Sequence, residues 1–264
     1  MVVVHDKLKV IIAAHKPFCA PGDGCYLAVQ AGAALRADIG LRRDDVGENI
    51  SARNGLYCEL TALYWAWKNL DCDALGLVHY RRYFGLPRRC VPWLAPMRRI
   101  ATGEELAALL AETPAILPRK RNYFIETRET QYVHAHGEAG LAALRAVLTR
   151  DAPQYLPAFE AGIRRTSGHC FNMFVMRRDL CNAYCEWLFK TLFAVEAYMR
   201  ENMPGEIKPR LFGFISERMI DCWLETNGVE YIELPVVNTE SQHWPRKAAY
   251  FLKRKYSHRK GTLK

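Results

Sequence analysis

One segment of the chain, LGLVHYRRYF at residues 75–84, joins an apolar run to a basic cluster and limits the possible folds most tightly. Residues 75–78 are short, apolar and contain a glycine, which is typical of a strand covered on both faces of a sheet. The run is followed by His79, Tyr80, Arg81 and Arg82. In open α/β sheets ligands bind beyond the carboxyl ends of the strands, so this cluster favours an anionic ligand, above all a phosphate group.

The length and charge of the chain agree with this interpretation. With 264 residues, of which 50% are hydrophobic, the chain can form one large α/β domain or two small ones, which excludes a disordered protein. Lys and Arg number 37 against 28 for Asp and Glu, so the formal net charge is +9. This excess favours polyanions, phosphorylated small molecules or an anionic membrane surface as partners.

Cysteine usage and the N-terminal segment argue against zinc binding and export. The nine cysteines include no CxxC pair, which makes a zinc site an unfavoured interpretation. Their odd number and apolar surroundings suit reduced core thiols of a cytoplasmic protein. Residues 1–17, MVVVHDKLKVIIAAHKP, are too short and too charged for a secretion signal or a membrane span.

Apolar runs alternate with segments of helical periodicity along the chain, as in α/β folds. We expect strands at residues 7–14, from residue 75, at 115–118, 171–176 and 231–237, and helices at 55–69, 102–111, 140–150, 179–200 and 211–227. Residues 86–99, which are rich in proline and arginine, form a candidate flap over the ligand site.

Two further strand ends carry positive charge. The first strand is followed by His15 and Lys16, and the strand at residues 115–118 is followed by Arg119, Lys120 and Arg121. Converging cations suit a diphosphate, which needs several donors. The alternative for residues 119–121 is a solvated basic patch.

Four polar side chains interrupt apolar stretches: Glu59, Asn172, Glu217 and Arg218. His169 stands in a polar segment that leads into the strand expected at residues 171–176. Glu59 is either structurally paired or functional, and Glu217 is either a salt-bridged helix residue or a general base. Asn172 is either a hydrogen-bonded core amide or a ligand contact.

Two patterns that are typical of metal sites do not favour a metal here. Asp71 and Asp73 form a DxD pair, but they precede the strand at residue 75, whereas the ligand crevice lies past its end. His134 and His136 could share one face of a strand, but no third ligand stands at a supporting spacing. We therefore predict no metal site and no cofactor, with a divalent cation bound by His79 as the alternative.

The C-terminal segment, residues 243–264, carries apolar residues at helical spacing among many lysines and arginines. This pattern suits a basic amphipathic segment that rests on an anionic membrane surface. A solvated, frayed terminus is the alternative.

Together, the motifs resemble those of a known family. They are DDVGENISARNGLYCELTALYWAWKN, LGLVHYRRYF, ILPRKRNYF, RTSGHCFNMFVM and LFGFISERMIDCWLE. In these the chain resembles the bacterial capsular-polysaccharide and exopolysaccharide glycosyltransferases whose signature is LVHYRRYF.

The resemblance implies a GT-A-like fold with a Rossmann-type central mixed sheet flanked by helices. It implies one catalytic domain at residues 1–242, with a nucleotide-sugar half at 7–120 and an acceptor half at 121–242, followed by the basic tail at 243–264. It further implies a hexosyltransferase that moves a sugar from a nucleotide-diphosphate sugar to a lipid-linked glycan at the inner face of the cell membrane. UDP is the expected nucleotide, and UDP-galactofuranose is a candidate donor.

The chain departs from the general GT-A pattern because HYRR stands where such enzymes carry DxD. The departure predicts transfer without a metal, in which Arg81 and Arg82 bind the diphosphate with His79 beside them. The expected nucleotide-sugar contacts are His15, Lys16, Tyr80, Glu59, Lys120 and Arg121. Glu217, or else Glu59, would deprotonate the acceptor, and His169, Asn172 and Arg218 would position donor or acceptor.

Two other classes of function compete with this hypothesis. A non-catalytic scaffold that binds nucleotide sugars has the same sequence pattern but no turnover. A nucleic-acid-binding protein would explain the net charge, but the sequence contains no zinc-finger, helix-turn-helix or RNA-recognition signature. We therefore expect no nucleic-acid partner.

Overall fold

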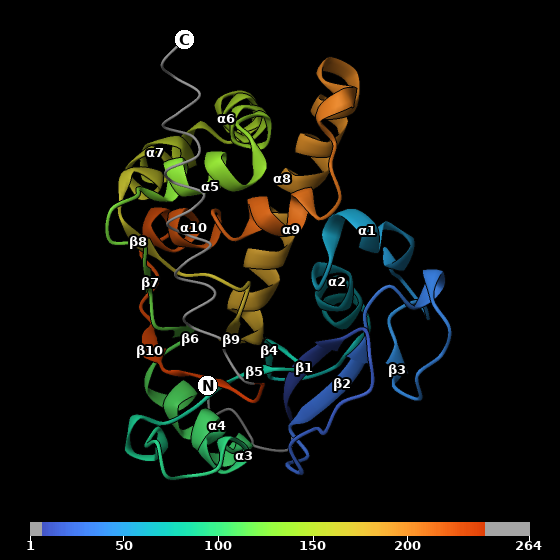
Figure 1. The fold of residues 1–264 in the computed structure, drawn as a ribbon, viewed down its shortest axis with the longest axis vertical. Coiled ribbons are helices and arrows are strands. Elements are labelled where there is room, and N and C mark those ends of the chain that lie inside the picture. The colour runs from blue at the N-terminus through green and yellow to red at the C-terminus, as the bar shows by residue number, and fades with distance from the viewer. Residues whose placement is uncertain (1–6, 241–264) are drawn as a thin grey trace.

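The computed structural model describes residues 7–240 (Figure 1). The expected membrane-contacting segment at residues 243–264 lies outside this range. Within the range, no helix is both long and apolar enough to cross a membrane.

A mixed β-sheet forms the centre of the molecule, as expected. Its strands run in the order β10-β6-β9-β4-β1-β2-β3 within the described part of the chain, and β5 and β11 join at one end of β4. The strands are β1 (Leu8–Ala14), β2 (Tyr26–Gln30), β3 (Arg42–Arg43), β4 (Ala74–His79), β5 (Arg82–Phe84), β6 (Ala115–Pro118), β9 (Phe174–Arg177), β10 (Ile232–Leu234) and β11 (Val236–Asn238). β4 is parallel to β1 and antiparallel to β9, and β6 is also antiparallel to β9. The carboxyl ends of β1, β4 and β6 therefore lie at the same edge.

Helices cover both faces of this sheet. They are α1 (Asn54–Tyr57), α2 (Leu60–Asn69), α3 (Pro96–Arg99), α4 (Gly103–Glu112), α5 (Arg128–His136), α6 (Ala139–Asp151), α7 (Leu156–Arg164), α8 (Arg178–Asn202), α9 (Leu211–Ser216) and α10 (Ile220–Thr226). In Figure 1, α3 and α4 lie on one side of the sheet, and α2 and α5 to α10 on the other. A small ribbon of β7 (Arg121–Asn122) and β8 (Ser167–Gly168) lies beside α10.

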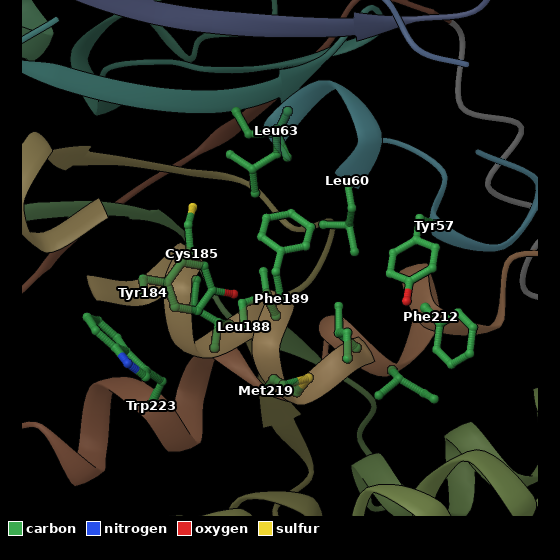
Figure 2. Packing of buried hydrophobic residues seen from close by; sticks show 14 of the residues in the cluster. Tyr57, Leu60, Leu63, Tyr184, Cys185, Leu188, Phe189, Phe212, Met219 and Trp223 are labelled. Carbon is green, nitrogen blue, oxygen red and sulfur yellow. The ribbon is translucent and has the colours of Figure 1, made fainter. Parts of the chain in front are cut away.

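Alternate residues of each central strand enter two different cores. In β1, Ile11 packs in the larger core with α2 and α8, whereas Val10 and Ile12 pack in the smaller core with α4. Figure 2 shows the larger core, where Phe189 of α8 lies against Leu60 and Leu63 of α2. Burial on both faces explains why these strands are continuously apolar in the sequence.

Gly76 allows β4 and β9 to approach closely. A Cβ atom at this position would lie 2.9 Å from the Phe174 carbonyl oxygen and 2.9 Å from Val175 Cγ2. The glycine in LGLVH therefore serves strand packing, and β4 can run straight to His79.

Two expected helices are each broken in two. The helix expected at residues 55–69 breaks at Cys58, which has φ 53° and ψ −128°, values that favour glycine. The helix expected at 211–227 breaks after Ser216 and resumes at Ile220. Each break carries one of the carboxylates that interrupt the apolar pattern, Glu59 and Glu217.

The expected strands differ in three places. The strand expected from residue 171 begins only at Phe174, because Phe171 (φ 76°) and Asn172 (φ 54°) are left-handed. The strand expected at 231–237 is divided into β10 and β11. The segment with the two histidines, 134 and 136, is helical and belongs to α5, not to a strand. Thr102 and Glu105 form a capping box at the start of α4.

Candidate functional site

A cavity of about 520 Å³ opens beyond the carboxyl ends of β1 and β4. This volume lies in the range of small-molecule and cofactor sites. Nine of the predicted site residues line it: His15, Glu59, His79, Tyr80, Arg81, Arg82, Arg121, Glu217 and Arg218. The candidate flap at residues 86–99, all of which the structure describes, contributes none of the lining.

The HYRR segment turns the chain from β4 into β5 and presents its side chains to the cavity. His79 Nε2 donates a hydrogen bond to the Phe171 carbonyl oxygen at 2.5 Å, and burial lowers the pKa of His79, so its ring is neutral near pH 7. Arg82 lies over the Phe171 ring at 4.5 Å, and burial lowers the pKa of its guanidinium. Arg81 Nη1 lies 3.6 Å from Glu240 Oε2. The histidine is therefore fixed to the core, and the arginines line the cavity.

Glu217 is the carboxylate whose environment most favours proton transfer. Its Oε1 accepts a hydrogen bond from the Phe171 backbone N–H at 3.2 Å, and its Oε2 lies 3.8 Å from Arg218 Nη1. Burial raises the pKa of Glu217; the negative charge of Glu59 raises it further, and the positive charge of Arg218 opposes the shift. About a fifth of the side chain, 21%, is exposed, so a ligand in the cavity can reach it. A raised pKa and access to the cavity are properties of a general base.

Asn172 acts on the second carboxylate, Glu59, and does not line the cavity. Its amide nitrogen donates to Glu59 Oε1 at 2.7 Å and to the Gly213 carbonyl oxygen at 3.1 Å, and its oxygen accepts from Ser216 Oγ at 2.9 Å. Of the two interpretations of Asn172, the hydrogen-bonded core amide therefore describes its place in the structure. Through it the turn before β9 fixes the position of Glu59.

His169, Lys120 and Lys16 do not line the cavity, contrary to expectation. The His169 ring is fully buried between Asp221 (Nδ1 to Oδ1, 2.5 Å) and Glu233 (Nε2 to Oε1, 3.1 Å). Lys120 Nζ donates to the Tyr231 hydroxyl at 3.1 Å, so of the basic residues at the end of β6 it is Arg121 that enters the lining. Lys16 is exposed and pairs with Glu240 at 3.0 Å.

Sequence reasoning missed several residues of the cavity wall. They are Arg36, Tyr123, Gln131, His136, Phe171, Arg210 and Phe214, with small groups from β1 and α1. Arg36 Nη2 lies 3.4 Å from Asn54 Oδ1 and Arg210 donates its backbone N–H to the Gly55 carbonyl oxygen at 2.8 Å, so both are held beside α1. The sequence marks these two arginines only by their positive charge. Because 37 residues of this chain are Lys or Arg, charge alone does not single them out.

The segment that follows β4 presents no carboxylate to the cavity. The side chains at the end of β4 are a neutral histidine bound to a carbonyl and two arginines, and no group of three potential metal ligands occurs in residues 7–240. Asp71 and Asp73 precede β4, as expected, at the opposite edge of the sheet. His134 contacts Glu126 at 2.8 Å, and His136 stacks on Phe214.

A family model described as "Domain of unknown function (DUF4422)" matches residues 9–228. The chain belongs to the DUF4422 family. Every residue that lines the cavity lies inside the matched range. A comparison with the curated proteins finds no match.

Among solved structures, the DUF4422 chain is similar to the one titled "WbbM bifunctional glycosyltransferase apo structure". The TM-score is 0.76 at 25% sequence identity, over 89% of this chain and 46% of that one. This chain therefore spans about half the length of that protein. The fold expected from the sequence, a mixed sheet flanked by helices as in a glycosyltransferase, is confirmed.

Proposed function

We propose that this chain is a glycosyltransferase that moves a sugar from a nucleotide-diphosphate sugar to a glycan acceptor during synthesis of a bacterial surface polysaccharide. The observation that carries the proposal is the cavity at the carboxyl ends of β1 and β4, where six arginines surround two carboxylates. Similarity to a glycosyltransferase structure supports the reaction class. The concentration of cations in a cavity favours a small anionic ligand over a nucleic acid.

The donor diphosphate binds the cations nearest to β1 and β4. Burial lowers the pKa of His15, and the positive charges of Arg36, Lys16, Arg81 and Arg210 lower it further. These cations are therefore near His15. Guanidinium groups suit phosphate oxygens and stabilise charge that develops on a leaving phosphate. UDP is the nucleotide we propose, and UDP-galactofuranose a candidate donor.

Glu217 acts as the base in the proposed reaction. The acceptor hydroxyl gives its proton to Glu217 and its oxygen forms a bond to the anomeric carbon of the donor. The bond between that carbon and the phosphate oxygen breaks, and the electron pair leaves with the nucleoside diphosphate. Arg81 and Arg82 neutralise the departing charge, so we propose that the step needs no metal.

The two halves proposed from the sequence, residues 7–120 and 121–242, both contribute to the cavity: the first supplies His15 and Arg81, and the second supplies Arg121 and Glu217. A donor held by the first half would therefore face an acceptor held by the second. A lipid-linked acceptor at the membrane, and membership of the LVHYRRYF enzymes of capsule and exopolysaccharide synthesis, belong to the same proposal.

A panel of nucleotide sugars tests the proposal. We expect a UDP-linked sugar to raise the melting temperature of the purified protein, with no change on adding manganese or a chelator. Arg81→Ala should abolish the shift, whereas Arg165→Ala, which removes an exposed partner of Glu225, should retain it.

Release of nucleoside diphosphate with an added glycan acceptor then separates an enzyme from a binding scaffold. A manganese requirement would refute the metal-free step, and binding without release would favour the scaffold.

A further inference from the structure

The cations of the cavity form two groups at opposite ends of α9. Arg210 precedes this helix, beside Arg36 and α1, whereas Arg218 follows it, on the side of β7 and β8. Arg210 and Arg218 therefore enter the cavity lining from the two ends of α9. We call the group of Arg121 and Arg218 the second cationic centre.

Arg218 is a buried cation whose donors are mostly unused. Its side chain is 3% exposed, and its Nη2 donates to Gln131 Oε1 at 2.7 Å. Its Nε and Nη1 have no hydrogen-bond partner, although Nη1 lies 3.8 Å from Glu217 Oε2. A guanidinium has five N–H donors, and leaving them unpaired inside a protein costs free energy. Arg218 lines the cavity, so its buried charge acts on any anion bound there.

Arg121 brings a second charge to the same place. It lies over one tyrosine ring, that of Tyr123, at 5.2 Å, and Arg218 lies 6.0 Å from the same ring. β7 pairs with β8 through Arg121 and Gly168, which fixes the backbone of this arginine. Both charges oppose the raised pKa of Glu217, so both are near its carboxylate. Two arginines beside one aromatic ring form a prepared site for an anion.

We propose that the second cationic centre binds an acidic group on the acceptor, a carboxylate or phosphate of the glycan. The proposal rests on the glycosyl transfer proposed above and identifies the acceptor class as an acidic glycan. The proposed function assigns the donor diphosphate to the cations at the carboxyl ends of β1 and β4, which leaves the second cationic centre for another anionic group. Glu217, adjacent to Arg218, then lies beside an acceptor hydroxyl near the acidic group. The paired donors of a guanidinium suit carboxylate and phosphate alike.

Matched acidic and neutral sugars test this inference by ligand-detected NMR on the full chain saturated with UDP. The pairs are methyl β-glucuronide with methyl β-glucoside for a carboxylate, and mannose 6-phosphate with mannose for a phosphate. We expect one acidic member to bind at least about tenfold more tightly than its neutral partner. Tighter binding of the glucuronide identifies a carboxylate as the acidic group, and tighter binding of mannose 6-phosphate identifies a phosphate.

Variants locate the preference. We assign Arg121, which the sequence predicted as a nucleotide-sugar contact, to the acceptor instead. Arg121→Gln and Arg218→Gln should therefore abolish the acidic preference while UDP still binds, and Arg81→Gln should weaken UDP binding while the acidic preference remains. Arg121 is exposed, so its variant keeps the test valid if Arg218→Gln fails to fold. Equal binding of both members in both pairs overturns the inference, as does a preference that survives in Arg121→Gln. If UDP does not bind but the acidic preference is present, the proposed function fails and the second centre stands.

Discussion

Glu217 occupies a break between two helices, where its carboxylate is buried beside a second carboxylate, Glu59, and an arginine. Its raised pKa means that the folded protein holds a proton at this position more tightly than the unfolded chain does. Stability from this group is present at low pH and is lost as the pH rises through the raised pKa. The same environment prepares the base and destabilises the ionised protein.

Glu217→Gln should therefore separate activity from stability. We expect sugar transfer to fall by about 10²- to 10⁴-fold, the usual worth of a general base, while the melting temperature at pH 8 rises. In the wild type, transfer should increase with pH through a pKa above the ordinary glutamate value. Glu206→Gln, at an exposed partner of Lys208, should leave transfer and melting temperature unchanged. If Glu217→Gln retains full transfer, another group is the base.

Asn172 stabilises the turn that holds Glu59. Asn172→Ala should lower the free energy of unfolding by about 1–3 kcal/mol, because the Gly213 carbonyl and Ser216 hydroxyl lose a buried partner. Transfer should fall as well, since Glu59 loses its donor. Urea denaturation measures the first effect, and Asn202→Ala, an exposed amide at the end of α8, is the control. Equal stability of the two variants would contradict the role of Asn172.

Among single residues, the sequence predicted the cavity residues whose chemical type is unusual for their sequence surroundings. It missed the cavity residues whose type is ordinary there. Glu59 and Glu217 were identified because carboxylates rarely interrupt apolar helical patterns. Arg36 and Arg210 lie in polar segments, where arginine is ordinary, and only the tertiary fold brings them to the cavity. His169 shows the converse: its polar surroundings in the sequence suggested a ligand contact, but Asp221 and Glu233 occupy its ring.

At the scale of elements, the apolar pattern predicted which segments are helical but not where they break. The hydrophobic face of residues 55–69 continues through Cys58, so its period gives no sign of the left-handed backbone there. The Asn54 side chain holds the break locally: its Nδ2 donates to the Cys58 carbonyl oxygen at 2.7 Å and to Thr61 Oγ1 at 3.1 Å. The predicted start of β9 at residue 171 was wrong because contacts with Glu217 and Glu59 hold Phe171 and Asn172 in a left-handed turn. The apolar pattern of the strand contains no sign of these contacts.

The junction of β4 and β9 depends on a missing side chain. Gly76→Ala should destabilise the protein by about 1–3 kcal/mol, because the new methyl group meets the Phe174 carbonyl oxygen and Val175 and the strands must separate. Displacement of β4 would also move His79, so nucleotide binding should weaken. Gly22→Ala, where a Cβ meets nothing within 4 Å, is the matched control for chemical denaturation. Equal midpoints for the two variants would show that the sheet absorbs the methyl group.

Across the whole molecule, the class of fold followed from strands that are apolar on both faces and alternate with amphipathic helices. Net charge predicted an anionic partner, and the structure shows where part of that charge gathers: six of the arginines line one cavity. The carboxyl ends of β1 and β4 were predicted as its location, because both strands end in basic residues. The sequence did not predict which distant segments are joined by buried ion pairs, because the partners come together only in the folded chain.

One buried network of ion pairs and hydrogen bonds joins α5, α10 and β10. Asp221 of α10 pairs with Arg128 of α5 at 2.6 Å, and both side chains are almost fully buried, at 6% and 1% exposure. Asp221 also accepts from His169, whose other ring nitrogen contacts Glu233 of β10. Burial opposes ionisation of Asp221, but the hydrogen bond from His169 and the charge of Arg128 hold its pKa below the ordinary value. The network therefore stabilises the fold while the carboxylate is charged.

Asp221→Asn should lower the free energy of unfolding at pH 7 by about 3–5 kcal/mol, because it leaves the Arg128 charge buried without its partner. Since the pKa of Asp221 is lowered by folding, its contribution is present above the ordinary aspartate value and is lost as the pH falls through the folded value. The difference between wild type and variant in chemical denaturation should therefore shrink on acidification. Glu225→Gln removes an exposed pair with Arg165 and should cost at most about 1 kcal/mol at any pH. A loss in Asp221→Asn no larger than in this control would mean that α5, α10 and β10 are held together by apolar packing alone.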